Sequence, residues 1–382
     1  MIAAVATPAA PAEAKPRIIA PAPYQVSFGR ISVVLPTGTV RLVVVVNGKR
    51  IARRPVNGRR DSVQVALPAK DSVIRVIAVD RRGKERLSSR IGPVHGLPPP
   101  GAPRTVGSRV DRVLQARLAT LLRAHPGSVA AYVHNVRTGA GAAWNASARF
   151  PAGSTLKLAI AVEALRALRG PPTHGSSIDS LMRSMILYSD NRAANGLEVA
   201  IAGSTSAGSA RVNAMMRSLG LVDSEMYGGY EIEERRRTAG GGIPIRVDEQ
   251  PAFPIGKYTS AADLGRLLEY VHLAAGGRGP LIRRFGGAVR PEEARYLLFL
   301  LAHVADHGKL DRFLPRATTV AHKAGWIDTA RHDNGLVYWA GGGFVAAVMT
   351  YSGAGVGTSA DILAGRVART ALDRYQALNH DA

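Results

Sequence analysis

The sequence predicts two domains, a small all-β sandwich followed by a larger α+β domain. Short apolar runs separated by turn pairs fill the first quarter of the chain, which is typical of antiparallel strands. Further along, a block of helical patterns stands between two sets of strand-like runs, and a last helical pattern closes the chain. A helical block between two halves of a sheet is the order of elements in a layered α+β domain.

The composition limits the classes of protein to which the chain can belong. Its 382 residues are 46% hydrophobic and include no cysteine, so we expect a globular chain without disulfides or thiolate metal sites. No apolar run approaches the roughly 18 residues of a membrane span. Residues 1–23 are rich in alanine and proline and are expected to be a disordered tail or the remnant of a secretion signal. We therefore expect an extracytoplasmic protein, secreted or associated with the cell envelope.

Residues 24–95 form the predicted β-sandwich. Turn pairs such as Asn47-Gly48 separate its apolar runs, and this pattern resembles the Ig-like modules of bacterial wall proteins. Residues 1–104 hold 18 basic and 5 acidic side chains, a net charge of +13, against +9 for the rest of the chain. We expect this module to bind an anionic cell-wall polymer or membrane surface. Zinc-finger spacings and phosphate-binding glycine loops are absent from the sequence, so we expect no nucleic acid partner.

Residues 96–105 are a predicted Pro/Gly linker, and residues 106–382 form the predicted α+β domain. Apolar residues spaced by three and four predict helices at 110–122, 154–169, 177–187, 192–201, 208–219, 260–275, 291–305 and 359–378. Strands are predicted at 129–136, 318–325, 334–340 and 343–351. The stretch 221–257 is rich in glycine and charge and is expected to be a long loop.

The candidate nucleophile is Ser154, which precedes Lys157 by three residues. Pro151 and Gly153 mark a turn, and the apolar run that follows predicts a buried helix beginning at Ser154. This spacing places both side chains on one helix face, where a desolvated neutral lysine can take the proton of a serine hydroxyl. Only eight of the 50 basic residues are lysines, and arginine could not act as such a base. The alternative interpretation is a helix-capping serine followed by a solvated lysine.

Two further motifs follow in order along the chain. Ser189-Asp190-Asn191 begins 35 residues after Ser154 and is, alone, typical of a helix cap. His322-Lys323-Ala324-Gly325-Trp326 ends a predicted strand, where a lysine near a glycine is unremarkable by itself. Taken together, the S-x-x-K, S-D-N and K-x-G motifs resemble the set found in class A β-lactamases and penicillin-binding proteins. The resemblance covers residues 106–382.

This resemblance implies a β-lactamase/transpeptidase-like fold, in which helices cover both sides of an antiparallel sheet. It also implies a serine hydrolase that opens amide bonds through an acyl-enzyme. In that scheme Ser154 attacks the carbonyl carbon, Lys157 shares or relays its proton, and Ser189 carries a proton toward the leaving nitrogen.

The resemblance implies substrate-binding roles for four further residues. Asn191 would hold the amide side chain of the substrate, and Lys323 would attract its carboxylate. Gly325 would let the substrate lie close to the backbone. The N–H groups of Ser154 and Trp326 would form an oxyanion hole.

The sequence departs from the family pattern in its third motif. Ala324 stands where the family usually has a threonine or serine hydroxyl that helps to hold the substrate carboxylate. Thr329 or Arg331 could take over this contact.

A second departure concerns the residue that activates water. Class A β-lactamases place a glutamate in an E-x-x-L-N pattern after S-D-N, and this glutamate activates the deacylating water. Loop 221–257 contains no such pattern. We assign a catalytic role to none of its glutamates, and the last three lie in a charge run that is expected to be solvated. The glutamates considered are Glu225, Glu231, Glu233 and Glu234.

Three functions remain open from the sequence. The first is β-lactam hydrolysis through a Ser154 acyl-enzyme, which the motif set favours. The second is a D,D-carboxypeptidase or transpeptidase acting on cell-wall peptides, which the missing glutamate favours. The third is a non-catalytic wall-binding protein, and the intact pair of Ser154 and Lys157 speaks against it.

Two histidines close to the third motif invite a metal interpretation. His322 and His332 are accompanied by neither an H-E-x-x-H motif nor a suitable spacing to further ligands. We therefore expect structural roles for both histidines, no metal or other cofactor, and a monomeric protein.

Overall fold

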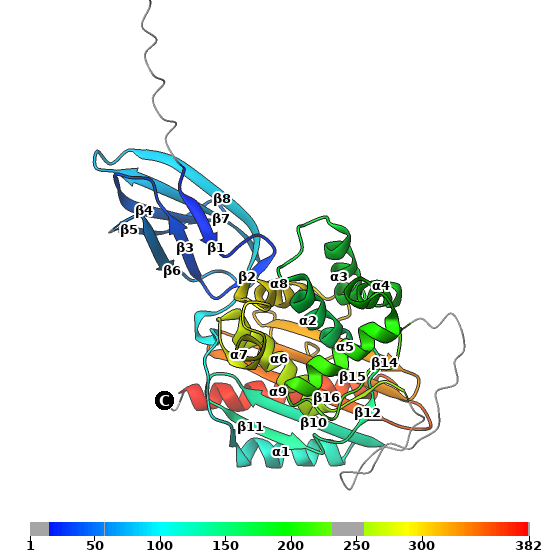
Figure 1. Ribbon diagram of the computed structural model, residues 1–382. Helices are drawn as coiled ribbons and strands as arrows, with labels where there is room; N and C mark the ends of the chain where they lie inside the picture. Colours follow the sequence, from blue (N-terminus) through cyan, green and yellow to red (C-terminus); the bar gives the residue numbers. More distant parts are fainter. Residues whose placement is uncertain (1–14, 57, 231–255, 381–382) are drawn as a thin grey trace, which may run out of the picture. The chain divides into compact units, whose positions relative to one another are not determined.

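The computed structural model describes residues 15–56, 58–230 and 256–380 (Figure 1). It divides into two compact units, residues 1–96 and residues 97–382. The first strand, β1 (Arg17–Ala20), lies within the expected tail, so the prediction that residues 1–23 precede all structure is wrong at its C-terminal end.

The first unit consists of two sheets packed around an apolar core. One sheet has the order β1-β3-β6, and the other has the order β2-β8-β7-β4-β5. Pairing is antiparallel except between β2 and β8. The core contains Val33, Val44 and Val76. The strands after β1 are β2 (Gln25–Ser27), β3 (Arg30–Val34), β4 (Thr39–Val46), β5 (Lys49–Pro55), β6 (Arg60–Gln64), β7 (Asp71–Asp80) and β8 (Glu85–Gly96).

The second unit is built on a six-stranded sheet with the order β14-β15-β16-β10-β11-β9. Strand β10 pairs with β16, which joins the early strands of the unit to its last three strands. All pairs are antiparallel except β9 with β11. The strands are β9 (Arg109–Val110), β10 (Ser128–Asn135), β11 (Ala140–Trp144), β14 (Thr319–Ile327), β15 (Ala330–Trp339) and β16 (Gly342–Tyr351).

Helices cover both faces of this sheet, as the resemblance implies (Figure 1). Helices α1 (Arg112–Arg123) and α9 (Ser359–His380) pack on one face, where Leu118 and Leu372 share a core with Val133. Residues alternate between the two faces of a strand, so the neighbouring Tyr132 points to the opposite face. There it contacts α6 (Ala261–Ala275), because Gly265 lies against its ring and Glu269 accepts a 3.0 Å hydrogen bond from its hydroxyl.

The remaining helices form the block that the sequence predicts between the two parts of the sheet. They are α2 (Lys157–Leu168), α3 (Ser177–Leu187), α4 (Asn191–Ala202), α5 (Thr205–Ser218), α7 (Gly279–Phe285) and α8 (Pro291–Leu301). The elements additional to the predictions include strand β11, which lacks β-branched residues, and α7, which has only seven residues. Among the described helices, none combines the length and the hydropathy needed to cross a membrane.

Candidate active site

The three motifs meet at one cavity of about 590 Å³ in the second unit. The turn before α2, the beginning of α4 and the end of β14 each contribute to its wall. The lining residues are Pro151, Gly153, Ser154, Asn191, Tyr230, Gly256, Lys257, Trp326, Ile327, Thr329, Tyr351 and Gly353.

Ser154 lies in the turn that leads into α2, which begins at Lys157. The prediction of a helix starting at residue 154 is therefore wrong by three residues. The backbone of Thr155 donates to the carbonyl of Ala152 at 3.2 Å, which closes the turn. Strand β15 also fixes the turn, because His332 Nε2 donates to the carbonyl of Pro151 at 2.7 Å.

Strand β14 passes unusually close to this turn. A Cβ atom at Gly325 would lie 2.5 Å from the backbone nitrogen of Ser154, closer than real Cβ atoms approach other atoms. A Cβ atom at Gly153, whose φ is +51°, would lie 2.8 Å from the backbone nitrogen of Trp326. Only glycine fits at both positions, and the backbone nitrogens of Ser154 and Trp326 lie on adjoining segments beside the cavity.

Lys157 is buried directly beside Ser154. Its Nζ donates to Ser154 Oγ at 3.0 Å and to Asn191 Oδ1 at 2.6 Å. It also donates to the backbone carbonyl of Ser189 at 2.5 Å. Burial, together with the positive charge of Lys323, lowers the pKa of Lys157 to about 7, although Asp190 acts in the opposite direction. A large part of the Lys157 population is therefore neutral near neutral pH.

Ser189 stands between the two lysines of the site. Lys323 Nζ donates to Ser189 Oγ at 3.0 Å, and Lys157 Nζ lies 3.4 Å from the same oxygen. Ser189 has a φ of +60°, a left-handed conformation that costs energy in a residue with a Cβ atom. Asp190 follows as the N-cap of α4 and accepts from Ala193 N at 2.7 Å, which fixes the chain immediately after the strained serine.

Lys323 completes the polar cluster from the β14 side. Its side chain is buried and its Nζ also donates to the carbonyl of Ala324 at 2.8 Å. Burial lowers the pKa of Lys323 to about 8, against the opposing effect of the carboxylates of Asp306 and Asp333. Hydrogen bonds thus join five of the predicted residues in one cluster: Ser154, Lys157, Ser189, Asn191 and Lys323.

Comparisons with known proteins identify the family and the fold. A model of the β-lactamase enzyme family matches residues 113–170 and 169–375, which is more than half of the chain. The chain belongs to the β-lactamase enzyme family. No curated protein matches its sequence.

Several solved structures share a fold with about 70% of this chain. PBP-A is 20% identical with a TM-score of 0.55, and the match covers 71% of this chain and 98% of PBP-A. A variant of PBP-A was solved as an acyl-enzyme complex with penicillin G. It is 21% identical with a TM-score of 0.53, and the match covers 71% of this chain and 98% of the variant. An ancestral class A β-lactamase is 20% identical with a TM-score of 0.51, covering 68% and 99%.

In this member of the β-lactamase family, an aromatic residue of loop 221–257, Tyr230, lies against Lys157. The ring of Tyr230 lies 4.6 Å from Lys157 Nζ and 4.8 Å from Lys257 Nζ, so it is held between two amines. Asn195 Oδ1 accepts a 2.6 Å hydrogen bond from the backbone nitrogen of Tyr230. The Tyr230 hydroxyl is buried and makes no hydrogen bond with the described residues.

A buried carboxyl group lies behind the tyrosine. Glu198 is fully buried, and its Oε1 accepts from Ser209 Oγ at 2.6 Å. Burial raises the pKa of Glu198 to about 7 and raises that of Tyr230 above its usual range. The sequence analysis missed Tyr230, Lys257 and Glu198. For Glu198 a signal existed, because it lies on the same helix face as the buried Ala194 and Ile201.

The glutamates considered for water activation do not line the cavity among the described residues. Glu225 pairs with β13 (Tyr258–Thr259) through its backbone, and its side chain accepts a 2.7 Å hydrogen bond from the Tyr258 hydroxyl. Glu231, Glu233 and Glu234 lie outside the described residues, as does the predicted charge run. The described part of the loop therefore brings a phenol, and no carboxylate, to the side of Lys157.

Thr329 and Arg331 are the two residues that could replace the hydroxyl missing at Ala324, and their surroundings differ. Thr329 lines the cavity, whereas Arg331 is held by Asp361 through a 2.8 Å ion pair. Thr329 is therefore the better placed of the two to meet a substrate carboxylate.

The two histidines near the third motif have protein partners. His332 is buried between the Pro151 carbonyl, to which Nε2 donates, and the Thr350 backbone N–H, which donates to Nδ1 at 3.2 Å. His322 Nδ1 lies 2.9 Å from a carboxylate oxygen of the buried Asp333. Both contacts tie β14 and β15 to their surroundings.

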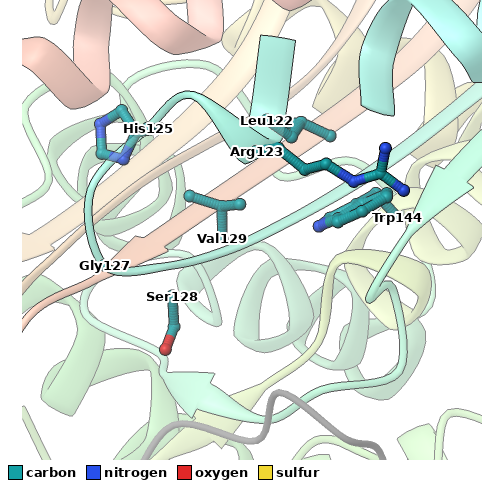
Figure 2. Close-up of a pocket in the computed structure, with 7 residues that line it drawn as sticks. All are labelled: Leu122, Arg123, His125, Gly127, Ser128, Val129 and Trp144. Atoms are coloured by element: carbon teal, nitrogen blue, oxygen red, sulfur yellow. The ribbon is translucent and has the colours of Figure 1, made fainter. Parts of the chain in front are cut away.

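A second hollow, of about 380 Å³, lies at the end of α1 away from these motifs (Figure 2). It contains Ser128, but the guanidinium of Arg123 stacks at 4.9 Å over the ring of Trp144, and no lysine or carboxylate lines it. His125 also lines the hollow, but neither of its ring nitrogens makes a hydrogen bond with the described residues, so no base is engaged with Ser128.

Proposed function

We propose that the second unit is a serine hydrolase that opens β-lactam amides through a covalent Ser154 acyl-enzyme. The observation that carries the proposal is the 3.0 Å hydrogen bond between Ser154 Oγ and Lys157 Nζ, whose pKa is lowered to about 7. A neutral amine at this distance can take the serine proton as the oxygen attacks.

The proposed acylation has three steps. Ser154 Oγ bonds to the carbonyl carbon while its proton passes to Lys157, and the resulting oxyanion accepts hydrogen bonds from the backbone N–H groups of Ser154 and Trp326. The C–N bond then breaks. The leaving nitrogen takes a proton from the Ser189 hydroxyl, which Lys157 replenishes over the 3.4 Å between Nζ and Oγ. One oxyanion donor of this kind is typically worth about 3 kcal/mol in the transition state.

Substrate binding in this proposal uses the rest of the cavity wall. The ammonium of Lys323 attracts the substrate carboxylate and keeps the Ser189 hydroxyl in place, and Thr329 supplies the hydroxyl that Ala324 lacks. Asn191 accepts from Lys157 through Oδ1, which leaves its amide N–H groups for a substrate carbonyl. The acyl-enzyme that a PBP-A variant forms with penicillin G supports the choice of β-lactams as the first substrates to test.

The second candidate is a D,D-carboxypeptidase or transpeptidase. The observation that favours it is the Tyr230 ring beside Lys157, because the described part of loop 221–257 brings no carboxylate there to activate a water for rapid β-lactam turnover. Such an enzyme would use the same acylation chemistry on a peptide ending in D-Ala-D-Ala.

A nitrocefin progress curve, combined with intact-mass measurement, tests the proposed function. We expect one opened β-lactam per chain, located on Ser154 by peptide mapping. Release of D-alanine from a D-Ala-D-Ala peptide at a higher rate than nitrocefin turnover would favour the peptidase. Absence of both label and product would leave the non-catalytic wall-binding protein.

The two lysine pKa values predict the pH dependence of acylation. Lys157 is an active base only when neutral, so the rate should rise with pH through about 7. Lys323 attracts a carboxylate only when charged, so the rate should fall again above about 8. Stopped-flow acylation rates between pH 5.5 and 9.5 should therefore give a narrow bell. In Lys323→Arg, which stays charged, the falling limb should disappear; its persistence would contradict the assignment.

A further inference from the structure

The outer face of the five-stranded sheet in the first unit carries an unusual array of side chains. The inner face packs into the core of the sandwich through Leu42 and Val44. The alternating residues of the same strands form a separate buried cluster on the outer face, made of Val43, Val45, Ile77 and Val79.

The strand register places arginines around this cluster. One row across four strands reads Arg50, Val45, Arg75 and Arg90 from β5 to β8. In the next rows Val43 pairs with Arg53, and Val79 pairs with Arg41. Paired residues of antiparallel strands share a face, so these five arginines, here called the arginine face, lie on one surface. All five are exposed.

The arginine face is poorly neutralised by the protein. Glu85, which pairs with Val79, makes a 2.6 Å ion pair with Arg50. Within the described residues, no ion pair reaches the other four arginines. Arg75 and Arg90 stand directly opposite each other, an arrangement that destabilises a sheet because the like charges repel. A bound anion would remove this cost.

We propose that the arginine face binds a linear phosphodiester polymer. Arginine presents a planar fork of N–H donors that suits oxyanions and stays charged at all relevant pH values. Side chains on neighbouring strands are about 5 Å apart, so Arg75 and Arg90 can both reach one group. The two charged oxygens of a phosphodiester point to different sides of its tetrahedral phosphorus, so one phosphate can accept from both guanidinium groups.

A polymer suits this surface better than a membrane does. The apolar residues of the outer face are buried, with exposed fractions between 1% and 6%, so they cannot insert among lipid chains. The arginines of the arginine face are spread over several rows of paired residues. A chain of repeated phosphates can contact several of these arginines at once, which raises the overall affinity.

The test measures binding of the full chain to poly(glycerol phosphate) at 50 mM NaCl. The variant Arg75→Gln/Arg90→Gln removes two charges from the arginine face. The control Arg59→Gln/Arg60→Gln removes two exposed charges at the beginning of β6, in the other sheet, and gives the same net charge. We expect about tenfold weaker binding for the first variant, less than about twofold for the control, and a shallower salt dependence for the first variant only.

Thermal unfolding separates a binding effect from a folding defect. Removing the repulsion should leave the melting temperature of Arg75→Gln/Arg90→Gln equal to or above that of the wild type. No binding by the wild type, or equal losses in both variants, would overturn the proposal. Tighter binding to polygalacturonate, duplex DNA or phosphatidylglycerol vesicles than to poly(glycerol phosphate) would overturn it in favour of a carboxylate polymer, nucleic acid or membrane.

Discussion

Ser154→Ala is expected to abolish covalent labelling by a penicillin, and Lys157→Met to slow it by about 10²- to 10⁴-fold. The alanine variant lacks the attacking oxygen. The methionine variant keeps most of the buried volume but loses the amine that hydrogen-bonds to Ser154 Oγ at 3.0 Å. Intact-mass measurement after timed exposure to benzylpenicillin gives both results.

A matched control is available in the second hollow. Ser128→Ala removes a serine hydroxyl that lines a cavity but has no lysine beside it (Figure 2). Its labelling rate should equal that of the wild type. Label retained by Ser154→Ala, or lost in Ser128→Ala, would show that the nucleophile is wrongly assigned.

The second large effect concerns the step after acylation. We expect a burst of about one equivalent of nitrocefin followed by slow turnover, because the acyl-enzyme forms faster than it hydrolyses. The Tyr230 ring lies 4.6 Å from Lys157 Nζ, and Glu225 is engaged by Tyr258. Tyr230→Glu would place a carboxylate beside Lys157, and the steady-state rate should rise by about 10²-fold or more as this group orients a water.

Tyr230→Phe is the control for this change. It keeps the ring and removes a hydroxyl that makes no hydrogen bond with the described residues. Its burst and its slow phase should match those of the wild type. If the wild type turned over nitrocefin rapidly without a burst, a water-activating group would already be present, and Glu198, with its pKa of about 7, would be the first residue to replace.

The sequence predicted the parts of the site that local motifs encode. Ser154 and Lys157 belong to one turn and helix, so their proximity follows from spacing. Ser189 and Lys323 are 134 residues apart in sequence, and that both join this pair followed only from the family resemblance. The prediction placed Ser154 at the first turn of α2, and it missed the irregular turn because the apolar run gives no sign of where helical hydrogen bonding starts.

The residues that the sequence analysis missed depend on tertiary contacts. Tyr230 meets Lys157 because Asn195 holds its backbone, and no periodic pattern in a glycine-rich loop indicates such a contact. The arginine face also depends on contacts that the sequence does not reveal. Alternation within each strand predicts a polar and an apolar side, but only the pairing of β7 with β8 brings Arg75 opposite Arg90.

Lys157 and Lys323 both approach the hydroxyl of Ser189, close enough for the charge of Lys323 to affect the ionisation of Lys157. The charge of Lys323 is one of the causes that lower the pKa of Lys157. A substitution that removes this charge therefore also converts part of the Lys157 population to the protonated, inactive form at neutral pH. Rate losses measured for the two lysines separately will overlap, and only a double-mutant cycle measured at several pH values can divide catalysis between them.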